Sequence, residues 1–213
     1  MMNFAIALLL QEPFNGKDLT GWKFKGAAEK SKWRAGKAAL DPADPKKLVV
    51  TEGGELVNAG GQGVDAYCEA KFGDILLEIE VMVPKGSNSG IYMMGEYEVQ
   101  VFDSFGKEKM GMGDMGALYS ASAPKKNACK APGEWQKFVI DFRAPKFDAD
   151  GKKSANAVFV KIELNGEIIQ ENVELKGPTP GGITGKESAT GPIMFQGDHG
   201  PVAFRAIKAT PVK

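Results

Sequence analysis

The sequence predicts an all-β fold, a two-sheet antiparallel β-sandwich. Glycine and proline are frequent in the 213-residue chain, with 27 and 12 copies, and both residues oppose helix interiors and serve turns. Short segments of alternating apolar and polar residues recur, whereas no window of 11 or more residues has a clear helical period. Many short strands require two packed sheets, because a single open sheet would leave one apolar face in water.

Composition excludes two classes of partner. The 27 Lys and Arg residues balance 27 Asp and Glu residues, and the lysines are scattered, so no basic stripe is available to neutralise the phosphates of a nucleic acid. No apolar run approaches the ~18 residues that a membrane span needs, so we expect no integral membrane association. The oligomeric state stays open.

The N-terminal residues 1–11 resemble the apolar part of a secretory signal without its basic start, although a first strand is an alternative. We therefore expect an exported protein, periplasmic or extracellular. Residues 12–213 are predicted to form a single domain, since no repeat or linker interrupts them. In an exported protein Cys68 and Cys129 could form one disulfide; two unpaired buried thiols are the alternative.

The middle of the chain carries the clearest strand signals. In residues 76–83 every second residue is apolar, which places Glu78 and Glu80 on the opposite face. Residues 89–94 and 97–103 follow after turn residues, so we expect the three segments to form a meander of antiparallel strands.

The C-terminal half predicts five more strands. Residues 157–164 and 167–170 flank Asn165 and Gly166, the dipeptide that best tolerates the positive φ of a tight hairpin turn. Residues 135–142, 191–196 and 202–207 also read as strands.

Polar residues recur on otherwise apolar strands. They are Glu78, Glu80, Asn88, Tyr92, Glu98, Gln100, Asp103, Gln196, Asp198 and His199. On neighbouring strands, such carboxylates, amides and aromatic rings could bind the hydroxyl groups of a sugar and stack on its ring. The alternative is the wetted outer face of a sandwich, which is polar in any case. His199 lies in a glycine-flanked loop, where an imidazole has no role in a core.

Six segments, taken together, resemble a known family over almost the whole chain. They are residues 14–22 (FNGKDLTGW), 88–92, 97–103, 116–119, 132–135 and 191–200. Their order is similar to that of the 3-keto-disaccharide hydrolase domain family. The resemblance implies a concanavalin A-like jelly roll, export from glycan-degrading bacteria and cleavage of glycosides whose sugar is oxidised at C3. The chain departs from the usual closing pattern V-x-F-R-N-I, because Ala206 replaces the asparagine.

A 3-keto-glycoside can be cleaved with few catalytic groups. A ketone at C3 acidifies the C2 proton, so a base can remove it and the resulting enolate can expel the C1 substituent, after which water adds back. We expect Glu98 or His199 to be the base and the other to be the leaving-group acid. The expected substrate-binding residues are Asn88, Tyr92, Gln100, Tyr119 and Gln196. No cofactor is certain, although a divalent metal ion held by Glu98, Asp103 or His199 could stabilise the enolate.

The alternatives to an enzyme are a non-catalytic carbohydrate-binding module and a structural domain. A binding module would use exposed aromatic platforms, and the chain has three tryptophans for this purpose, Trp22, Trp33 and Trp135. Trp22 and Trp135 adjoin strand or turn signals, so we expect them in the core. A solvent-facing tryptophan pair would favour the module.

Overall fold

The computed structural model describes residues 10–212, and this part of the chain is almost entirely β-structure. A single 3-10 turn, η1 (Ala28–Lys30), is its helical element. The strands are β1 (Trp22–Lys25), β2 (Trp33–Leu40), β3 (Leu48–Asn58), β4 (Asp65–Cys68), β5 (Ile75–Met82), β6 (Asn88–Met93), β7 (Tyr97–Phe102), β8 (Gln136–Arg143), β9 (Lys146–Phe147), β10 (Lys153–Ala155), β11 (Ala157–Leu164), β12 (Glu167–Leu175), β13 (Met194–Phe195) and β14 (Val202–Pro211).

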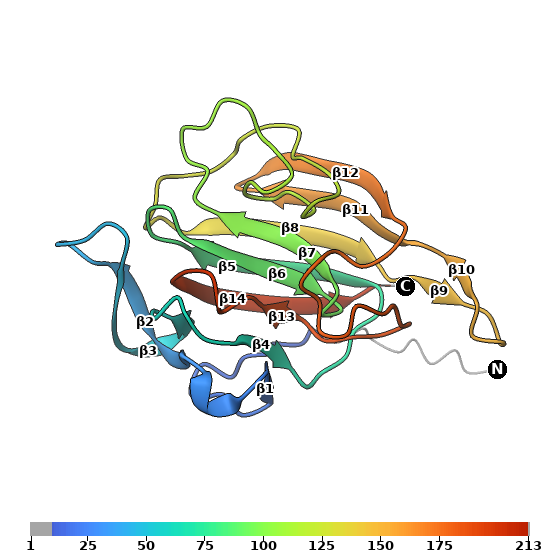
Figure 1. Cartoon of the computed structure of the whole chain (residues 1–213), viewed down its shortest axis with the longest axis horizontal. Helices are drawn as coiled ribbons and strands as arrows, with labels where there is room; N and C mark the ends of the chain where they lie inside the picture. The colour runs from blue at the N-terminus through green and yellow to red at the C-terminus, as the bar shows by residue number, and fades with distance from the viewer. Residues whose placement is uncertain (1–9, 213) are drawn as a thin grey trace.

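Twelve of these strands form two antiparallel sheets that stack face to face, and β9 and β10 form a separate two-stranded sheet. One sheet has the order β1-β4-β13-β6-β7, and the other has the order β12-β11-β8-β5-β14-β3-β2. In Figure 1, β6 and β7 lie in front of the larger sheet, and the small β9–β10 hairpin projects at one end. The predicted two-sheet antiparallel sandwich, a concanavalin A-like jelly roll, is confirmed.

Local patterns predicted several strands correctly. Along β5 the apolar residues Leu77 and Ile79 are buried while Glu78 and Glu80 point outward. The tight hairpin between β11 and β12 is also present, with φ of 54° at Asn165 and 86° at Gly166. Both features depend on neighbouring residues alone, which is why the sequence reveals them.

The predicted meander is wrong, because its first strand belongs to the other sheet. Strand β5 pairs with β8 and β14, whereas β6 pairs with β7 and β13. The chain changes sheets at residues 83–87, where the amide of Ser87 closes a turn on the carbonyl of Pro84. Alternation fixes which side chains face the core, but it does not specify the neighbouring strand.

Aromatic side chains join the two sheets. Phe195 of β13 stacks on Phe204 of β14 with ring centroids 4.1 Å apart, although the two strands belong to different sheets. Trp22 also stacks on Phe195, with ring centroids 5.5 Å apart, and Trp33 stacks on Phe204 at 6.0 Å. Such pairs contribute roughly 0.5–1.5 kcal/mol each beyond the area that they bury. The core therefore fixes β13 rigidly beneath the loop that follows it.

Two long connections cover the free edge of β7. The amide of Glu98 donates to the hydroxyl of Thr179 (2.8 Å), and the carbonyl of Glu98 accepts from the amide of Tyr119 (3.2 Å). The amide of Gln100 donates to the carbonyl of Ala117 (2.9 Å). The connections 103–135 and 176–193 thereby pack against the five-stranded sheet and satisfy backbone groups that an edge strand would otherwise expose.

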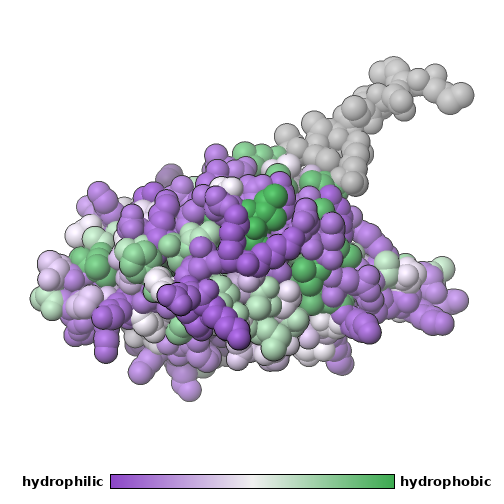
Figure 2. Space-filling model, turned by 90° about the horizontal axis from the view of Figure 1, so that it is seen from above, coloured by the Kyte–Doolittle hydropathy of each residue, from purple (hydrophilic) through white to green (hydrophobic). Residues whose placement is uncertain are grey.

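The residues of the expected export signal lie largely outside the described part, which begins at Leu10. Within that part, the backbone of Gln11 pairs with Ala209 of β14. No helix in residues 10–212 is both long enough and apolar enough to span a bilayer. The face seen in Figure 2 is mostly hydrophilic, with hydrophobic residues in small separate groups.

The disulfide prediction is wrong, since both cysteines are free thiols. Cys68 is buried in β4 and accepts a hydrogen bond from the amide of Ile193 (3.4 Å). Cys129 lies in the 103–135 connection, where burial raises the pKa of its thiol to about 12. The alternative of two unpaired thiols is the one that the structure has.

Candidate active site

A pocket of about 190 Å³ opens on the outer face of the five-stranded sheet. Its lining residues are Asn88, Tyr92, Glu98, Gln100, Tyr119, Pro180, Gly181, Gln196 and His199. Seven of them are residues that the sequence analysis proposed for catalysis or substrate binding. The volume is below the roughly 300–1,000 Å³ of pockets for drug-sized ligands and suits a single sugar ring.

The pocket floor consists of side chains from β6 and β7. Tyr92 lies opposite Glu98 and Gly90 lies opposite Gln100 in the antiparallel register. Because side chains alternate between faces, these residues point outward while Ile91 and Val99 enter the core. The floor is nevertheless shielded: Glu98 is 2% exposed and Gln100 is 3% exposed, since the two connections cover them.

Glu98 is the carboxylic acid of the pocket, and its pKa is strongly raised. Burial raises the pKa of its carboxyl group to about 7, although a hydrogen bond from Tyr92 and the positive charge of His199 oppose the rise. Burial, followed by the nearby charge of Glu98, raises the pKa of the Tyr92 hydroxyl, which therefore stays protonated. The floor thus combines a carboxyl group that titrates near neutral pH with a hydroxyl donor beside it.

The absence of a side chain at Gly90 makes room for Glu98. A Cβ atom at position 90 would lie 2.3 Å from Oε1 of Glu98 and 3.0 Å from Cε2 of Tyr92. The first distance is too short for a real contact, and the second is tighter than most real contacts. Glycine in the middle of this strand therefore permits the carboxylate to lie directly over the sheet.

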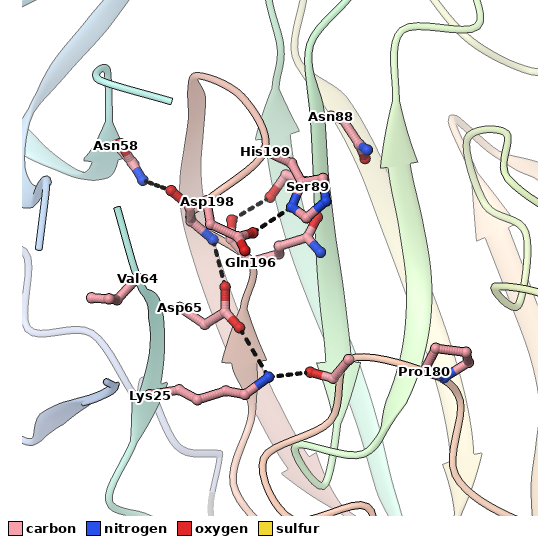
Figure 3. A network of polar contacts seen from close by, with 12 residues as sticks. Lys25, Asn58, Val64, Asp65, Asn88, Ser89, Pro180, Gln196, Asp198 and His199 are labelled. Carbon is pink, nitrogen blue, oxygen red and sulfur yellow. Dashed lines mark hydrogen bonds and ion pairs between the residues drawn. The ribbon is translucent and has the colours of Figure 1, made fainter. Parts of the chain in front are cut away.

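Three buried side chains hold the loop that carries His199 (Figure 3). Asn58 donates to the carbonyl of Gly197 (2.7 Å), Asp65 accepts from its amide (3.0 Å), and Ser89 donates to the carbonyl of Gln196 (2.8 Å). Burial raises the pKa of Asp65 in spite of the bond from Gly197. These three hydrogen bonds fix the main chain of the loop.

The imidazole of His199 lies at the mouth of this pocket, where its side chain is about half exposed. Its Nδ1 contacts a carboxylate oxygen of Asp198, which favours a proton on Nδ1 and leaves Nε2 free to face a ligand. An exposed imidazole with an orienting carboxylate can transfer a proton to a group that leaves toward solvent.

The amide groups of the pocket differ in how they are satisfied. Nε2 of Gln100 donates to Oδ1 of Asn88 (3.0 Å), which fixes both side chains. Oε1 of Gln196 is buried and has no hydrogen-bond partner within the described part of the chain. A buried acceptor of this kind costs free energy unless a donor meets it, and a sugar hydroxyl is a suitable donor.

Comparison with known proteins identifies the fold and the family. A family model described as the 3-keto-alpha-glucoside-1,2-lyase-like domain matches residues 10–210. The chain belongs to this family. The resemblance seen in the sequence motifs is therefore confirmed.

Solved structures from Parabacteroides distasonis are similar to this family member over almost its whole length. A crystal structure described as a candidate glycosyl hydrolase is 28% identical, with a TM-score of 0.71, and the match covers 95% of this chain and 84% of that one. A second, described in the same words, is 18% identical with a TM-score of 0.65 and coverages of 96% and 94%; it supports the fold alone. No protein of curated function matches the chain.

Three acidic residues that the sequence grouped with the site lie elsewhere. Glu78 and Glu80 point from the outer face of the other sheet, where they pair with Lys137 (3.3 Å) and Arg205 (2.6 Å). Asp103, the proposed metal ligand, does not line the pocket, because it follows the end of β7 and its carboxylate binds backbone amides outside the pocket.

The side chain of Asp103 instead stabilises a turn. Its Oδ2 accepts from the amide of Gly86 (2.8 Å), and its Oδ1 accepts from the amide of Phe105 (3.3 Å). Within residues 10–212, no cluster of three or more His, Cys, Asp or Glu side chains is arranged to hold a metal ion.

The tryptophans do not form a binding platform for sugars. Trp22 is buried in the core as predicted, and Trp33 is also buried. The prediction for Trp135 is wrong in part: it is only partly buried, and the guanidinium of Arg205 lies 4.0 Å from its ring centroid. The observation that would have favoured a carbohydrate-binding module, a solvent-facing tryptophan pair, is therefore missing from the described residues.

Several residues that shape the pocket escaped the sequence analysis. Asn58, Asp65 and Ser89 hold the His199 loop from strands far away in the sequence, and Gly181 forms part of the wall. The signal that could have indicated Asp65 is a charged residue within an otherwise apolar strand, but β4 is too short for an alternation to be recognised.

Proposed function

We propose that the protein cleaves glycosides whose sugar carries a ketone at C3, by removing the C2 proton and eliminating the C1 substituent. The observation that carries the proposal is the buried carboxyl group of Glu98, with a pKa of about 7, on the floor of a pocket the size of one sugar. The family description, which names a 1,2-lyase activity, supports it.

Glu98 is the base of this reaction. Above neutral pH its carboxylate takes the C2 proton, and because it is shielded from water it is a stronger base than an exposed glutamate. The electron pair of the C2–H bond forms a C2=C3 enolate. The hydroxyl of Tyr92 lies beside Glu98 and stays protonated, so it can donate to the enolate oxygen on C3.

His199 is the acid for the leaving group. As the C3 carbonyl re-forms, the C1–O bond breaks, a C1=C2 double bond forms, and the departing oxygen takes a proton from the imidazole. The place of His199 at the mouth fits a group that leaves toward solvent. Water then adds its hydroxyl to C1 and a proton to C2, so cleavage overall consumes one water molecule.

Direct hydrolysis of an unoxidised glycoside is a poorer fit. That reaction requires two carboxyl groups that flank the scissile bond, about 5–9.5 Å apart. Glu98 is the one carboxylate among the described residues that line the pocket. Elimination needs a single carboxylate base, which is what the pocket offers.

The remaining polar groups suit the hydroxyl groups of the sugar. The buried Oε1 of Gln196 can accept from one hydroxyl, while the Asn88–Gln100 pair presents its free amide atoms to another. A carbohydrate substrate outside the cell also agrees with our expectation of an exported protein, which stays part of the proposal.

The test compares a 3-keto-disaccharide with its unoxidised parent. The purified protein should release both sugars from the 3-keto compound and leave the parent intact, as followed by NMR. Replacement of Glu98 by Gln should lower turnover by at least ~100-fold, whereas Glu78→Gln, a carboxylate on the other sheet, should not change it. Equal cleavage of both substrates, or an active Glu98→Gln variant, would refute the mechanism.

A further inference from the structure

One wall of the pocket is a segment that crosses the outer face of the five-stranded sheet. We call residues 177–185 the strap; it contributes Pro180 and Gly181 to the pocket lining. Its anchors on one side all belong to the β6–β7 hairpin. The carbonyl of Glu96 accepts from the amide of Thr179 (3.0 Å), and the buried Glu96 carboxylate accepts from the amides of Thr184 (2.8 Å) and Gly185 (2.9 Å).

At Gly181 the strap meets Lys25, which reaches over from β1 at the opposite edge of the sheet. The Lys25 ammonium group donates to the carbonyl of Gly181 at 2.6 Å (Figure 3). On the other side, Gly181 lies against the pocket floor, since a Cβ atom there would be 2.5 Å from the hydroxyl of Tyr92. The hydroxyl of Tyr92 also donates to the carbonyl of Pro180 (3.4 Å), so Lys25 and Tyr92 hold this part of the strap from opposite sides.

Lys25 also contacts the support of the loop that carries His199. Lys25 and Asp65 are directly opposite each other in the β1–β4 register, and their charged groups are 3.5 Å apart. The other carboxylate oxygen of Asp65 accepts from the amide of Gly197. One side chain thus connects the strap and the His199 loop, although Lys25 does not itself line the pocket.

We propose that Lys25 is a positioning residue of the active site, which holds the strap against the substrate and ties it to the His199 loop. The inference rests on the proposed function. The His199 loop has two further anchors, Asn58 and Ser89, whereas Lys25 is the side chain that holds Gly181. Loss of Lys25 therefore releases the strap more than the loop, and it weakens substrate binding more than the chemical step.

The chain offers a matched control for the experiment. Lys23 lies on the same strand and face, two residues away, and its ammonium group pairs with the exposed Glu69 (2.9 Å) instead of the strap. Lys25→Met and Lys23→Met remove the same charge and keep the aliphatic stem. Lys25→Arg restores a cation that can donate to Gly181 and Asp65.

We expect Lys25→Met to raise KM for a 3-keto-disaccharide about tenfold, as loss of a charge-assisted hydrogen bond allows, with a smaller change in kcat. Lys23→Met should behave like the wild type, and Lys25→Arg should recover most of the lost affinity. Equal effects of Lys25→Met and Lys23→Met, or a loss confined to kcat, would overturn the proposal.

A second measurement does not depend on turnover. Hydrogen exchange of backbone amides in residues 177–185 should be faster in Lys25→Met than in Lys23→Met or the wild type, because the strap opens more often. Unchanged exchange would show that Lys25 does not hold the strap. If the wild type cleaves no 3-keto-glycoside, the proposed function fails, and hydrogen exchange still decides whether Lys25 positions the strap.

Discussion

Replacing Gly90 by alanine is a selective way to move the carboxylate of Glu98. The new Cβ atom would lie 2.3 Å from Oε1 of Glu98, and an ordinary contact requires at least 3.4 Å, so this oxygen must move by about 1.1 Å. Position 90 lies in β6 and has no positive φ, so alanine strains the backbone little. The perturbation is therefore concentrated on the side chains of the pocket floor.

The expected effect on activity is large. Misplacement of a catalytic group by ~1 Å can reduce a rate by about 100-fold, which corresponds to about 2.7 kcal/mol in the activation free energy. The cost in the free energy of unfolding should be about 1–3 kcal/mol, as for other overpacked sites. Cleavage of a 3-keto-disaccharide measures the first effect, and thermal unfolding followed by circular dichroism measures the second.

Gly73→Ala is the matched control. A Cβ atom at position 73 would lie 3.4 Å from the carbonyl oxygen of Ala189, which is an ordinary contact, and this glycine has no positive φ and does not line the pocket. The control should keep both the activity and the melting temperature of the wild type. A folded Gly90→Ala protein within threefold of wild-type activity would show that the position of Glu98 does not control the reaction.

Three further predictions concern titration, backbone strain and the thiols. Because the pKa of Glu98 is raised from its ordinary 4.5 to about 7, kcat/KM should rise as the pH approaches neutrality and the carboxylate forms, and a profile that is flat between pH 5 and 9 would contradict the assignment. The raised pKa of Glu98 also destabilises the fold by about 3 kcal/mol as the pH rises from 4.5 through 7, so Glu98→Gln should melt roughly 6–12 °C higher than the wild type at pH 8 but not at pH 4. Ala206 is exposed and has φ of 50°, a conformation that asparagine tolerates better, so Ala206→Asn should increase the free energy of unfolding by about 0.5–1 kcal/mol in urea titrations; a decrease would be inconsistent with this reading. Since Cys68 and Cys129 are free, a reducing agent should leave the melting temperature unchanged, and a fall of several degrees would reveal a disulfide.

The features that the sequence predicted correctly are local ones. The alternation along β5 and the Asn165–Gly166 turn follow from a few neighbouring residues, as does the shared face of Glu98 and Gln100. Alternation does not place Asp103, because this residue follows the end of β7 and its carboxylate accepts from amides of a turn.

Sheet membership and the support of the pocket could not be predicted in this way. Period-two alternation does not specify the neighbouring strand, so nothing local separates β5 from β6 and its partner β7. Lys25 and Asp65 meet Gly181 and Gly197 only because β1 and β4 complete the same sheet as β13. These contacts span more than 100 residues of sequence, and no local pattern records them.

The proposed mechanism depends on one step, the removal of the C2 proton of a 3-keto-glycoside by Glu98. Cleavage of a 3-keto-disaccharide in deuterium oxide tests it directly, because elimination followed by addition of water places a solvent deuteron on C2 of the released keto sugar. The free keto sugar, incubated with the protein for the same time, corrects for exchange after cleavage. We predict one deuterium at C2 in each newly released keto sugar, and essentially no cleavage by Glu98→Gln. Release of a keto sugar that keeps its original C2 hydrogen would contradict the mechanism and point to direct hydrolysis at C1.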